Sequence, residues 1–152
     1  MSFEFVSPMS GMMLDLSQVP DPAFSKKFLG DGYACAVNGS KVTAPFDGEV
    51  IAVFRTGHAV ALKDHKGVEV LLHIGIDTVK LNGEGFQCHV EKGQTIRKND
   101  LLLELDLDII SKAKSLISPI VFTNGLEIQL LKENQMLTNG EADLFAVLKE
   151  GA

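Results

Sequence analysis

The chain has 152 residues, of which 45% are hydrophobic and 22% are charged, and its formal net charge is −6. This length fits a single domain with a buried core, and the composition excludes an intrinsically disordered chain. The negative charge, with no run of Lys and Arg, argues against a protein that binds nucleic acid through its phosphates.

The predicted elements are mainly short β-strands, because runs rich in Val, Ile and Leu alternate with turn residues about every ten positions. A capped helix begins at Asp21–Pro22 and closes at Gly30, and a second helix, Leu107–Leu116, ends ahead of Pro119. In chain order, the predicted strands are Lys41–Thr43, Gly48–Thr56, Ala59–Lys63, Val68–Ile74, Thr95–Ile96, Leu101–Leu105, Ile117–Thr123 and Leu144–Leu148. The pattern predicts an all-β fold, an antiparallel β-sandwich or barrel with one or two short helices.

No linker or low-complexity segment divides the chain, so we expect one domain over residues 1–152. Within it, we expect residues 1–6 to be flexible. The N-terminus resembles no secretion signal, and no run of about 18 apolar residues predicts a membrane span. Only Cys35 and Cys88 are present, which favours two packed thiols in a reducing cytosol over a disulfide framework. Because the chain opens on Met1 and ends soon after the last predicted strand, we expect a free-standing cytoplasmic protein.

One predicted strand, Val68–Ile74, carries a histidine inside an otherwise apolar run. Strand alternation places Val68, Val70, Leu72 and Ile74 on one face, which is the core face. It places His73 on the other face, beside Leu71.

A predicted hairpin brings a second histidine to the same face. Asp64–Gly67 has the Asp-first, Gly-fourth pattern of a type I turn. A turn centred between His65 and Lys66 pairs His58 directly with His73, whereas a shift of one residue pairs His58 with Gly75. In both registers the two histidines share a face. Thr56 and Phe54, which precede His58 by two and four residues, belong to the same face.

Two facing imidazoles favour phosphoryl chemistry over a purely structural role. A neutral imidazole nitrogen is a competent nucleophile, and a second ring can donate a hydrogen bond to phosphoryl oxygens. Zinc needs a third or fourth ligand, and neither Glu69 nor Asp77 is an obvious one. No phosphate-binding glycine loop is present, which argues against a nucleotide as the donor. We interpret His65, in the predicted turn, and His89, beside Cys88, as structural residues. The sequence spacing predicts no second functional group near either of them.

Four ordered motifs carry a family likeness: "VPDPAFSKKFLGDG" (Val19–Gly32), "VTAPFDGEV" (Val42–Val50), "TGHAVAL" (Thr56–Leu62) and "LLHIGIDTVKLNGEGF" (Leu71–Phe86). Together they resemble the glucose-family IIA component of the bacterial phosphoenolpyruvate-dependent sugar phosphotransferase system. The likeness extends from Ser7 to about Leu148 in this sequence.

The resemblance implies a phosphocarrier, a phosphotransferase component with a phosphohistidine intermediate. Its phosphoryl group would come from phospho-HPr, rest on Nε2 of His73 and pass to a cysteine of a sugar-specific IIB domain. His58 would support the transfer, and Thr56 would orient a ring through its hydroxyl group. Members of the family usually have Thr-Asn-His where this chain has Thr56-Gly57-His58. The likeness does not name the sugar, which the membrane component selects.

The resemblance also implies a partner face around the histidines. Its apolar patch matches Ala23, Phe28, Leu29, Phe54 and Leu71, and its acidic rim matches Asp21 and Asp77. Each aspartate has a structural alternative, Asp21 as a helix N-cap and Asp77 as a cap of the following turn. No cofactor is required, although His58 and His73 would bind zinc if a partner supplied a further ligand. The family likeness implies a monomer that reaches the membrane only through the permease.

Two other functions fit parts of the sequence. "APFDGEVIAV" and "VEKGQTIRKNDLLLELD" (Val90–Asp106) resemble strand and turn segments of biotinyl and lipoyl carrier domains. Such a carrier needs a hairpin lysine within Met-Lys-Met or Asp-Lys-Ala, and the nearest segment here, Asp64-His65-Lys66, lacks these flanking residues. A regulatory binding module without chemistry is the remaining alternative.

Overall fold

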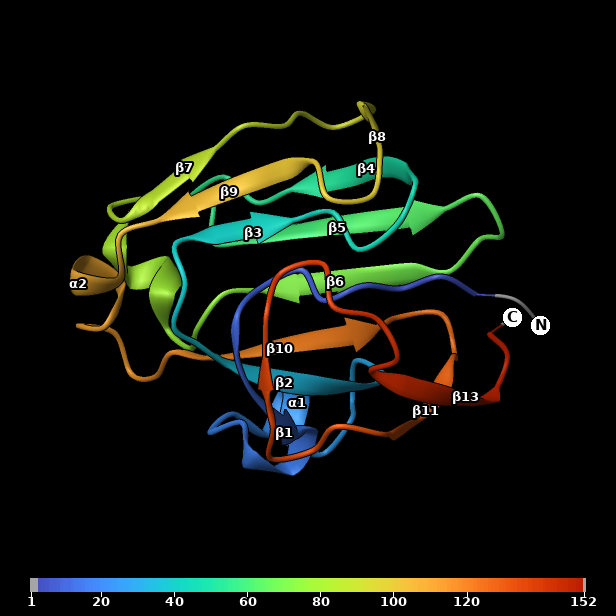
Figure 1. Ribbon diagram of the computed structural model, residues 1–152. Coiled ribbons are helices and arrows are strands. Elements are labelled where there is room, and N and C mark those ends of the chain that lie inside the picture. The colour runs from blue at the N-terminus through green and yellow to red at the C-terminus, as the bar shows by residue number, and fades with distance from the viewer. Residues whose placement is uncertain (1–2, 152) are drawn as a thin grey trace.

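The computed structural model describes residues 3–151, and its strands form three antiparallel sheets. The largest has the strand order β12-β1-β2-β10-β6-β5-β4-β8, and the smaller ones have the orders β3-β9-β7 and β11-β13. Figure 1 shows the three-stranded sheet beside β4 and β5. The strands are β1 (Gly11–Asp15), β2 (Asp31–Val37), β3 (Lys41–Thr43), β4 (Gly48–Val53), β5 (Ala59–Asp64), β6 (Glu69–His73), β7 (Phe86–Cys88), β8 (Thr95–Ile96), β9 (Leu101–Leu105), β10 (Ile117–Phe122), β11 (Glu127–Leu130), β12 (Met136–Leu137) and β13 (Phe145–Lys149).

Helical segments are short in this fold. They are α1 (Pro22–Ser25), α2 (Leu107–Ile110) and the 3₁₀ turns η1 (Leu16–Gln18) and η2 (Thr78–Leu81). The prediction of an antiparallel all-β fold with short helices is therefore confirmed.

Both faces of the large sheet are covered by apolar packing. The main core joins Leu62 and Leu72 of the large sheet to Val42 and Leu103 of the three-stranded sheet. A second cluster on the other face holds α1 against the sheet; its members are Leu16, Val19, Phe24, Ala34, Ile76 and Val121. This cluster fixes α1 beside the end of β6, where His73 lies.

Several predicted boundaries were wrong. The second helix ends at Ile110 instead of Leu116, and Pro119 lies inside β10. β4 ends at Val53, so Thr56 belongs to a turn and not to a strand. The sequence did not predict β1, β2, β7, β11 and β12. β2 reads Asp-Gly-Tyr-Ala-Cys-Ala-Val and is almost continuously buried, so it shows neither alternation nor a β-branched run.

The β5–β6 hairpin has a register between the two that the sequence offered. His73 pairs with Ala59, and Lys63 pairs with Glu69. The amide of Gly67 donates to the carbonyl of Asp64, as a type I turn requires, but Gly67 then adds a left-handed residue with φ of 91°. A type I turn followed by a left-handed residue makes a three-residue hairpin loop. Both predicted pairings of His58 were therefore wrong.

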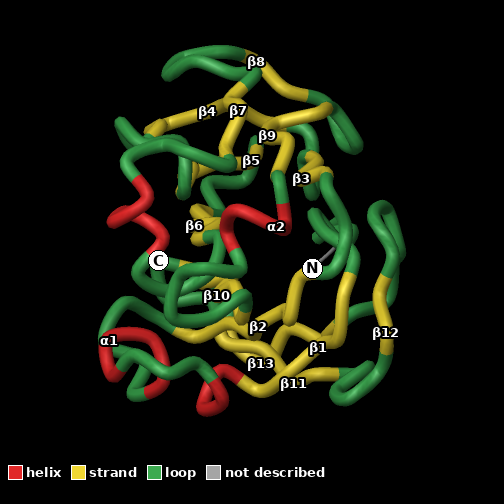
Figure 2. Tube along the Cα trace, turned by 90° about the vertical axis from the view of Figure 1, so that its left-hand side faces the viewer, coloured by secondary structure: helices red, strands yellow, loops and turns green. Residues whose placement is uncertain are grey.

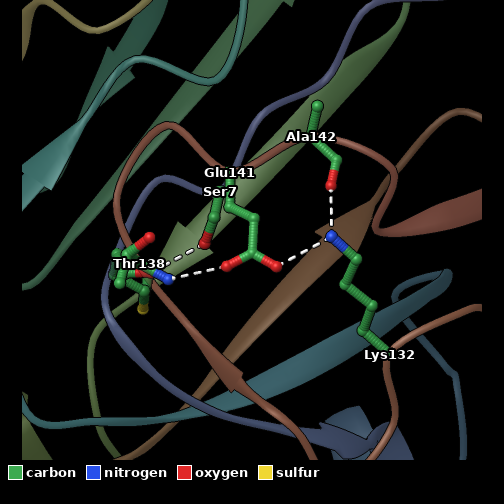
Figure 3. A network of polar contacts seen from close by, with 6 residues as sticks. Ser7, Lys132, Thr138, Glu141 and Ala142 are labelled. Carbon is green, nitrogen blue, oxygen red and sulfur yellow. Dashed lines mark hydrogen bonds and ion pairs between the residues drawn. The ribbon is translucent and has the colours of Figure 1, made fainter.

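Polar contacts fasten the N-terminal segment to the loop after β12 (Figure 3). The backbone N–H of Ser7 donates to the carbonyl of Glu141 over 2.8 Å. The carboxylate of Glu141 pairs with Lys132 Nζ at 2.8 Å and accepts the Thr138 amide at 3.2 Å, and Lys132 also donates to the carbonyl of Ala142. We call these five residues the Glu141 network.

The segment expected to be flexible, residues 1–6, is only partly described. Residues 1 and 2 lie outside the described residues, so flexibility there stays a prediction. Phe5 and Val6 are buried, and the ring of Phe3 lies 6.3 Å from that of Phe122.

Candidate functional site

The two histidines of the predicted site lie side by side. Their ring centroids are 5.0 Å apart, and the ring planes are nearly perpendicular, at 78°. In Figure 1 the start of β5 and the end of β6 lie toward the side of the molecule opposite the chain termini, behind α2 and its adjoining loops. Figure 2 faces this end, where loops and short helical segments surround the strands.

The histidines meet although strict alternation would separate them. With Ala59 opposite His73, alternation would turn His58 to the core face, with Val60 and Leu62. His58 lies before the first residue of β5 and follows Gly57, whose φ is 73°. The regular pattern therefore does not extend to His58, and its ring lies against that of His73. The predicted pair is present, but for a different geometric reason.

A backbone hydrogen bond orients the ring of His73. Its Nδ1 lies 2.8 Å from the carbonyl oxygen of Gly75. Because a carbonyl can only accept, Nδ1 must carry the proton, and the lone pair of the neutral ring is then at Nε2. Gly75 has a φ of 68°, and a Cβ there would lie 2.7 Å from both the Ser115 carbonyl oxygen and Thr78 Cγ2. The accepting carbonyl thus depends on glycine at this position.

A hydroxyl group orients the ring of His58. Thr56 Oγ1 and His58 Nδ1 are 2.5 Å apart. When the hydroxyl donates to Nδ1, the proton of the neutral His58 ring is at Nε2, and this nitrogen becomes a donor. The predicted contact between Thr56 and a histidine is therefore present, although it is made within a turn.

Both Nε2 atoms remain open to a ligand. Within residues 3–151, neither forms a hydrogen bond, and the Tyr33 hydroxyl is the one side-chain group that is fully buried without a partner. The two Nε2 atoms must therefore keep some contact with solvent, even though His58 as a whole is only 6% exposed. One ring offers a lone pair, and the other can offer a proton.

The surroundings keep both rings neutral at physiological pH. Burial, followed by repulsion from His73, lowers the pKa of His58 to about 4. Burial also lowers the pKa of His73, and the bond to Gly75 and the charge of Asp21 oppose that shift. Neutral imidazoles are the form that a nucleophile requires.

Two phenylalanines pack against the histidines. Phe54, which the sequence predicted beside the site, lies 5.5 Å from His58 between ring centroids. Phe24 lies 5.1 Å from His73 and is 5% exposed, and the sequence did not single it out for the site. Phe24 and Phe28 are four residues apart, and residues at this spacing share a helical face only if the helix includes both. A helix too short to include Phe28 could therefore have indicated one buried and one exposed ring. α1 ends at Ser25, so Phe24 and Phe28 separate.

The other positions of the predicted apolar patch differ in exposure. Phe28 is 73% exposed and Leu29 and Phe54 are also exposed, whereas Ala23 and Leu71 are half-buried. Val79 in η2 is an exposed apolar residue that the sequence analysis did not include. Exposed apolar side chains next to a reactive group are typical of a surface that a partner covers.

The two predicted acidic positions play different local roles. Asp21 caps α1 by accepting the amide of Ala23 at 2.9 Å, as its structural alternative predicted. Asp77 has a φ of 61° and makes no side-chain cap bond, so its predicted cap role was wrong. Its carboxylate instead pairs with Lys80 at 3.5 Å. Contact of either residue with a partner stays a prediction.

The remaining histidines and cysteines have no hydrogen bond to the histidine pair. His65 is in the exposed hairpin loop, and His89 pairs with Glu104 at 2.9 Å. Cys35 is buried as predicted, but Cys88 is exposed, so packing explains only one of the two thiols. Within the part of the chain that the structure describes, no three His, Cys, Asp or Glu residues are grouped as metal ligands.

Comparisons with known proteins show the family of the chain. Residues 3–128 match the family described as "phosphoenolpyruvate-dependent sugar phosphotransferase system, EIIA 1". The chain is 47% identical over 133 residues to the glucosamine-specific EIICBA component of the phosphotransferase system of Bacillus subtilis (strain 168). The structure is similar to that of glucose permease IIA from Mycoplasma capricolum, with 33% sequence identity and a TM-score of 0.81. This match covers 95% of the present chain and 94% of the Mycoplasma chain.

The fold and the family match thus define a domain of the EIIA type of the sugar phosphotransferase system. The chain belongs to the EIIA 1 family. The aligned region makes up 87% of this chain but only 21% of the Bacillus protein, so the chain spans about a fifth of that relative. Among residues 3–151, no helix combines the length and the apolar content that crossing a bilayer requires.

Proposed function

We propose that His73 accepts a phosphoryl group on Nε2 and passes it on during sugar uptake. The observation that carries this proposal is the bond from His73 Nδ1 to the Gly75 carbonyl, which leaves the lone pair at Nε2 beside the ring of His58. The donor is phospho-HPr, and the acceptor is a cysteine of a sugar-specific IIB domain. Membership in the EIIA family supports both partners.

The transfer to His73 exchanges one nitrogen–phosphorus bond for another. Nε2 attacks the phosphorus in line, and the bond to the donor imidazole breaks, with its electron pair returning to that ring. The proton on Nδ1 of His73 stays there and remains hydrogen-bonded to the carbonyl oxygen of Gly75. Both reactants are nitrogen nucleophiles, so the step proposed here needs no cofactor.

His58 supports the phosphoryl group without bonding to phosphorus. Its Nε2–H donates to a phosphoryl oxygen, where charge is spread in a loose transition state. Thr56 keeps this proton at Nε2 by occupying Nδ1. The low pKa of His58 leaves the ring neutral, so this donor orientation is maintained throughout the physiological range.

The exposed apolar residues around the site form the surface for the partners. Phe28, Leu29 and Phe54 would exclude water from the labile phosphoryl group when HPr or IIB covers them. Asp21 and Asp77, at the rim, would meet basic groups on HPr. The names of the two relatives include glucosamine and glucose, and we propose a permease of this sugar class as the acceptor system.

Zinc fits the histidine pair only as a shared site. His58 and His73 would hold the ion through their Nε2 atoms, because both Nδ1 atoms are already engaged. Two imidazoles leave a tetrahedral zinc two ligands short, so the partner or water must supply the rest. Bound zinc would join the chain to such a partner.

We place the protein in the cytoplasm, as a monomer that meets the membrane only through its permease. The presence of only two cysteines, one buried and one exposed, supports a reducing compartment. That it occurs as a free-standing protein stays a prediction.

Phosphoryl transfer from phosphorylated HPr tests the proposal. The wild-type protein should gain one acid-labile phosphoryl group by mass spectrometry, and His73→Gln should gain none, because its side chain has no imidazole nucleophile. His58→Gln should still be phosphorylated but should pass the group to IIB more slowly. Phosphorylation of His73→Gln at the wild-type level would exclude His73 as the acceptor. Lipoylation or biotinylation of the wild-type chain would favour the alternative carrier, and tight partner binding without phosphorylation would favour a regulatory module.

A further inference from the structure

Two buried hydroxyl groups hold the peptide bond between Ile74 and Gly75. On one side, Thr78 Oγ1 donates to the carbonyl oxygen of Ile74 at 2.6 Å. On the other side, the amide of Gly75 donates to Ser118 Oγ at 2.9 Å. Thr78 and Ser118 are both 0% exposed, so water cannot replace either contact.

The direction of each hydrogen bond is fixed. The Ser118 hydroxyl donates its own proton to the carbonyl of Leu116 at 2.9 Å, so its oxygen can only accept from Gly75. The carbonyl oxygen of Ile74 can only accept a hydrogen bond, so the Thr78 hydroxyl must be the donor. The peptide therefore has a donor on one side and an acceptor on the other, and rotation of its plane would break both bonds.

This peptide immediately precedes the carbonyl that orients His73. The Gly75 carbonyl accepts from His73 Nδ1, and the next amide, that of Ile76, donates to the Ser115 carbonyl at 2.9 Å. Residues 74–76 are thus fixed by η2 and by the start of β10. Neither Thr78 nor Ser118 forms a hydrogen bond with a histidine. Any effect on His73 must pass through the backbone.

We propose that Ser118 and Thr78 are positioning residues that set the tautomer of His73. By fixing the Ile74–Gly75 peptide, they aim the Gly75 carbonyl at Nδ1, and the proton stays there while the lone pair stays at Nε2. This inference rests on the proposed role of His73 as the phosphoryl acceptor. A carbonyl that turned away would free Nδ1, and the neutral ring could then exchange its proton between the two nitrogens.

Nitrogen-15 NMR of histidine-labelled protein, without any phosphoryl donor, measures this tautomer directly. The wild-type His73 ring should be in the Nδ1–H form. Ser118→Ala removes the acceptor of the Gly75 amide, and the spectrum should then show a mixture of both tautomers. Ser118→Thr keeps a hydroxyl group and should restore the wild-type spectrum. Ser115→Ala is the matched control: Ser115 Oγ accepts the amide of Ile117 in the same segment but does not contact the Ile74–Gly75 peptide, so the spectrum should not change.

The same variants are then tested with phosphorylated HPr. Ser118→Ala should accept the phosphoryl group about tenfold more slowly, the scale of effect expected for a group that orients a reactive ring through a hydrogen bond. Ser118→Thr and Ser115→Ala should be close to wild type. If Ser118→Ala does not fold, Thr78→Val tests the other side of the same peptide and should also give mixed tautomers.

The possible outcomes separate the two proposals. A pure Nδ1–H tautomer in folded Ser118→Ala or Thr78→Val, or an Nε2–H tautomer in the wild-type protein, would overturn the positioning role. Wild-type protein with the Nδ1–H tautomer that accepts no phosphoryl group would overturn the proposed function and leave the structural part of the inference intact.

Discussion

The histidine site and the Glu141 network are both polar clusters in a mainly apolar fold, and they satisfy their polar groups differently. In the Glu141 network the charges are paired, and both carboxylate oxygens of Glu141 have a partner (Figure 3). At the histidine site, each ring uses Nδ1 for a structural bond and keeps Nε2 without a partner among the described residues. The first arrangement holds two segments together, and the second holds two nitrogens ready for a ligand.

The difference shows how the structure can separate stability from chemistry. A polar group with all its partners in place contributes to stability and offers nothing to a substrate. A group with one partner can be oriented and still be available. We therefore expect changes in the Glu141 network to alter stability alone, and changes at the histidine site to alter phosphoryl transfer above all.

Outside the two histidines, the largest expected effect is that of Gly75→Ala. The substitution places a Cβ 2.7 Å from two atoms and forces alanine to a φ of 68°, so the carbonyl that orients His73 must move. A displacement of this kind can reduce a rate on the order of 100-fold. Phosphoryl acceptance from HPr measures the loss.

Gly67→Ala is the control for Gly75→Ala. It has a similarly left-handed φ of 91°, but its Cβ would meet nothing within 4 Å. Backbone strain should lower its free energy of unfolding by about 1 kcal/mol, measured by denaturant unfolding. Its rate of phosphoryl acceptance should stay at the wild-type value. Equal loss of activity in both variants would mean that backbone strain, and not the Gly75 carbonyl, matters for transfer.

A smaller effect is expected from pH. The pKa of His58 is lowered from 6.5 to about 4, so the unfolded chain binds a proton more readily than the folded protein. The contribution of the neutral His58 ring to the free energy of unfolding is therefore fully present above pH 6.5. It is lost as the pH falls from there toward 4. In urea titrations, His58→Gln should therefore show a smaller loss of unfolding free energy than wild type between neutral pH and pH 5, by on the order of 1 kcal/mol after screening by solvent. The same loss in both proteins would contradict the buried, neutral state of His58.

The smallest effect is expected in the Glu141 network. Bonding to Lys132 lowers the pKa of Glu141, so its contribution is present above the ordinary glutamate pKa and is lost as the pH falls through the lowered value. Lys132→Met should reduce the free energy of unfolding at pH 7 by about 0.5–1 kcal/mol, the range for a partly exposed ion pair. Phosphoryl acceptance should remain at the wild-type rate. A slower rate in this variant would show that the Glu141 network and the histidine site are coupled, and that stability and chemistry are not separate in this protein.

The sequence predicted the site better than it predicted the path of the chain to the site. Strand alternation correctly placed His73 opposite the core face, because β6 is regular over its whole length. The predicted register was wrong because Gly67 adds a left-handed residue to the loop, and strand alternation does not extend to His58 because β5 begins one residue after it. The two errors offset each other.

Other features left no usable pattern in the sequence. Phe24 reads like any helical phenylalanine, and only the short length of α1 separates it from Phe28. Ser118 and Thr78 are polar residues within apolar segments, and their role depends on contacts between η2, β10 and the end of β6. β2 was missed because it is buried on both faces by the two apolar clusters.

The two orienting bonds of the site share one simple property, their spacing. Thr56 lies two residues before the histidine that it orients, and Gly75 lies two residues after the other. Each orienting bond therefore lies within three consecutive residues, Thr56–His58 and His73–Gly75, but the carbonyl of the second is also held by Ser118 and Thr78 through the Ile74–Gly75 peptide. The two halves of the site therefore differ in what a transfer to another antiparallel hairpin would require: Thr56–His58 would carry its own orienting group, whereas His73–Gly75 would also need the two hydroxyl groups that hold the Ile74–Gly75 peptide.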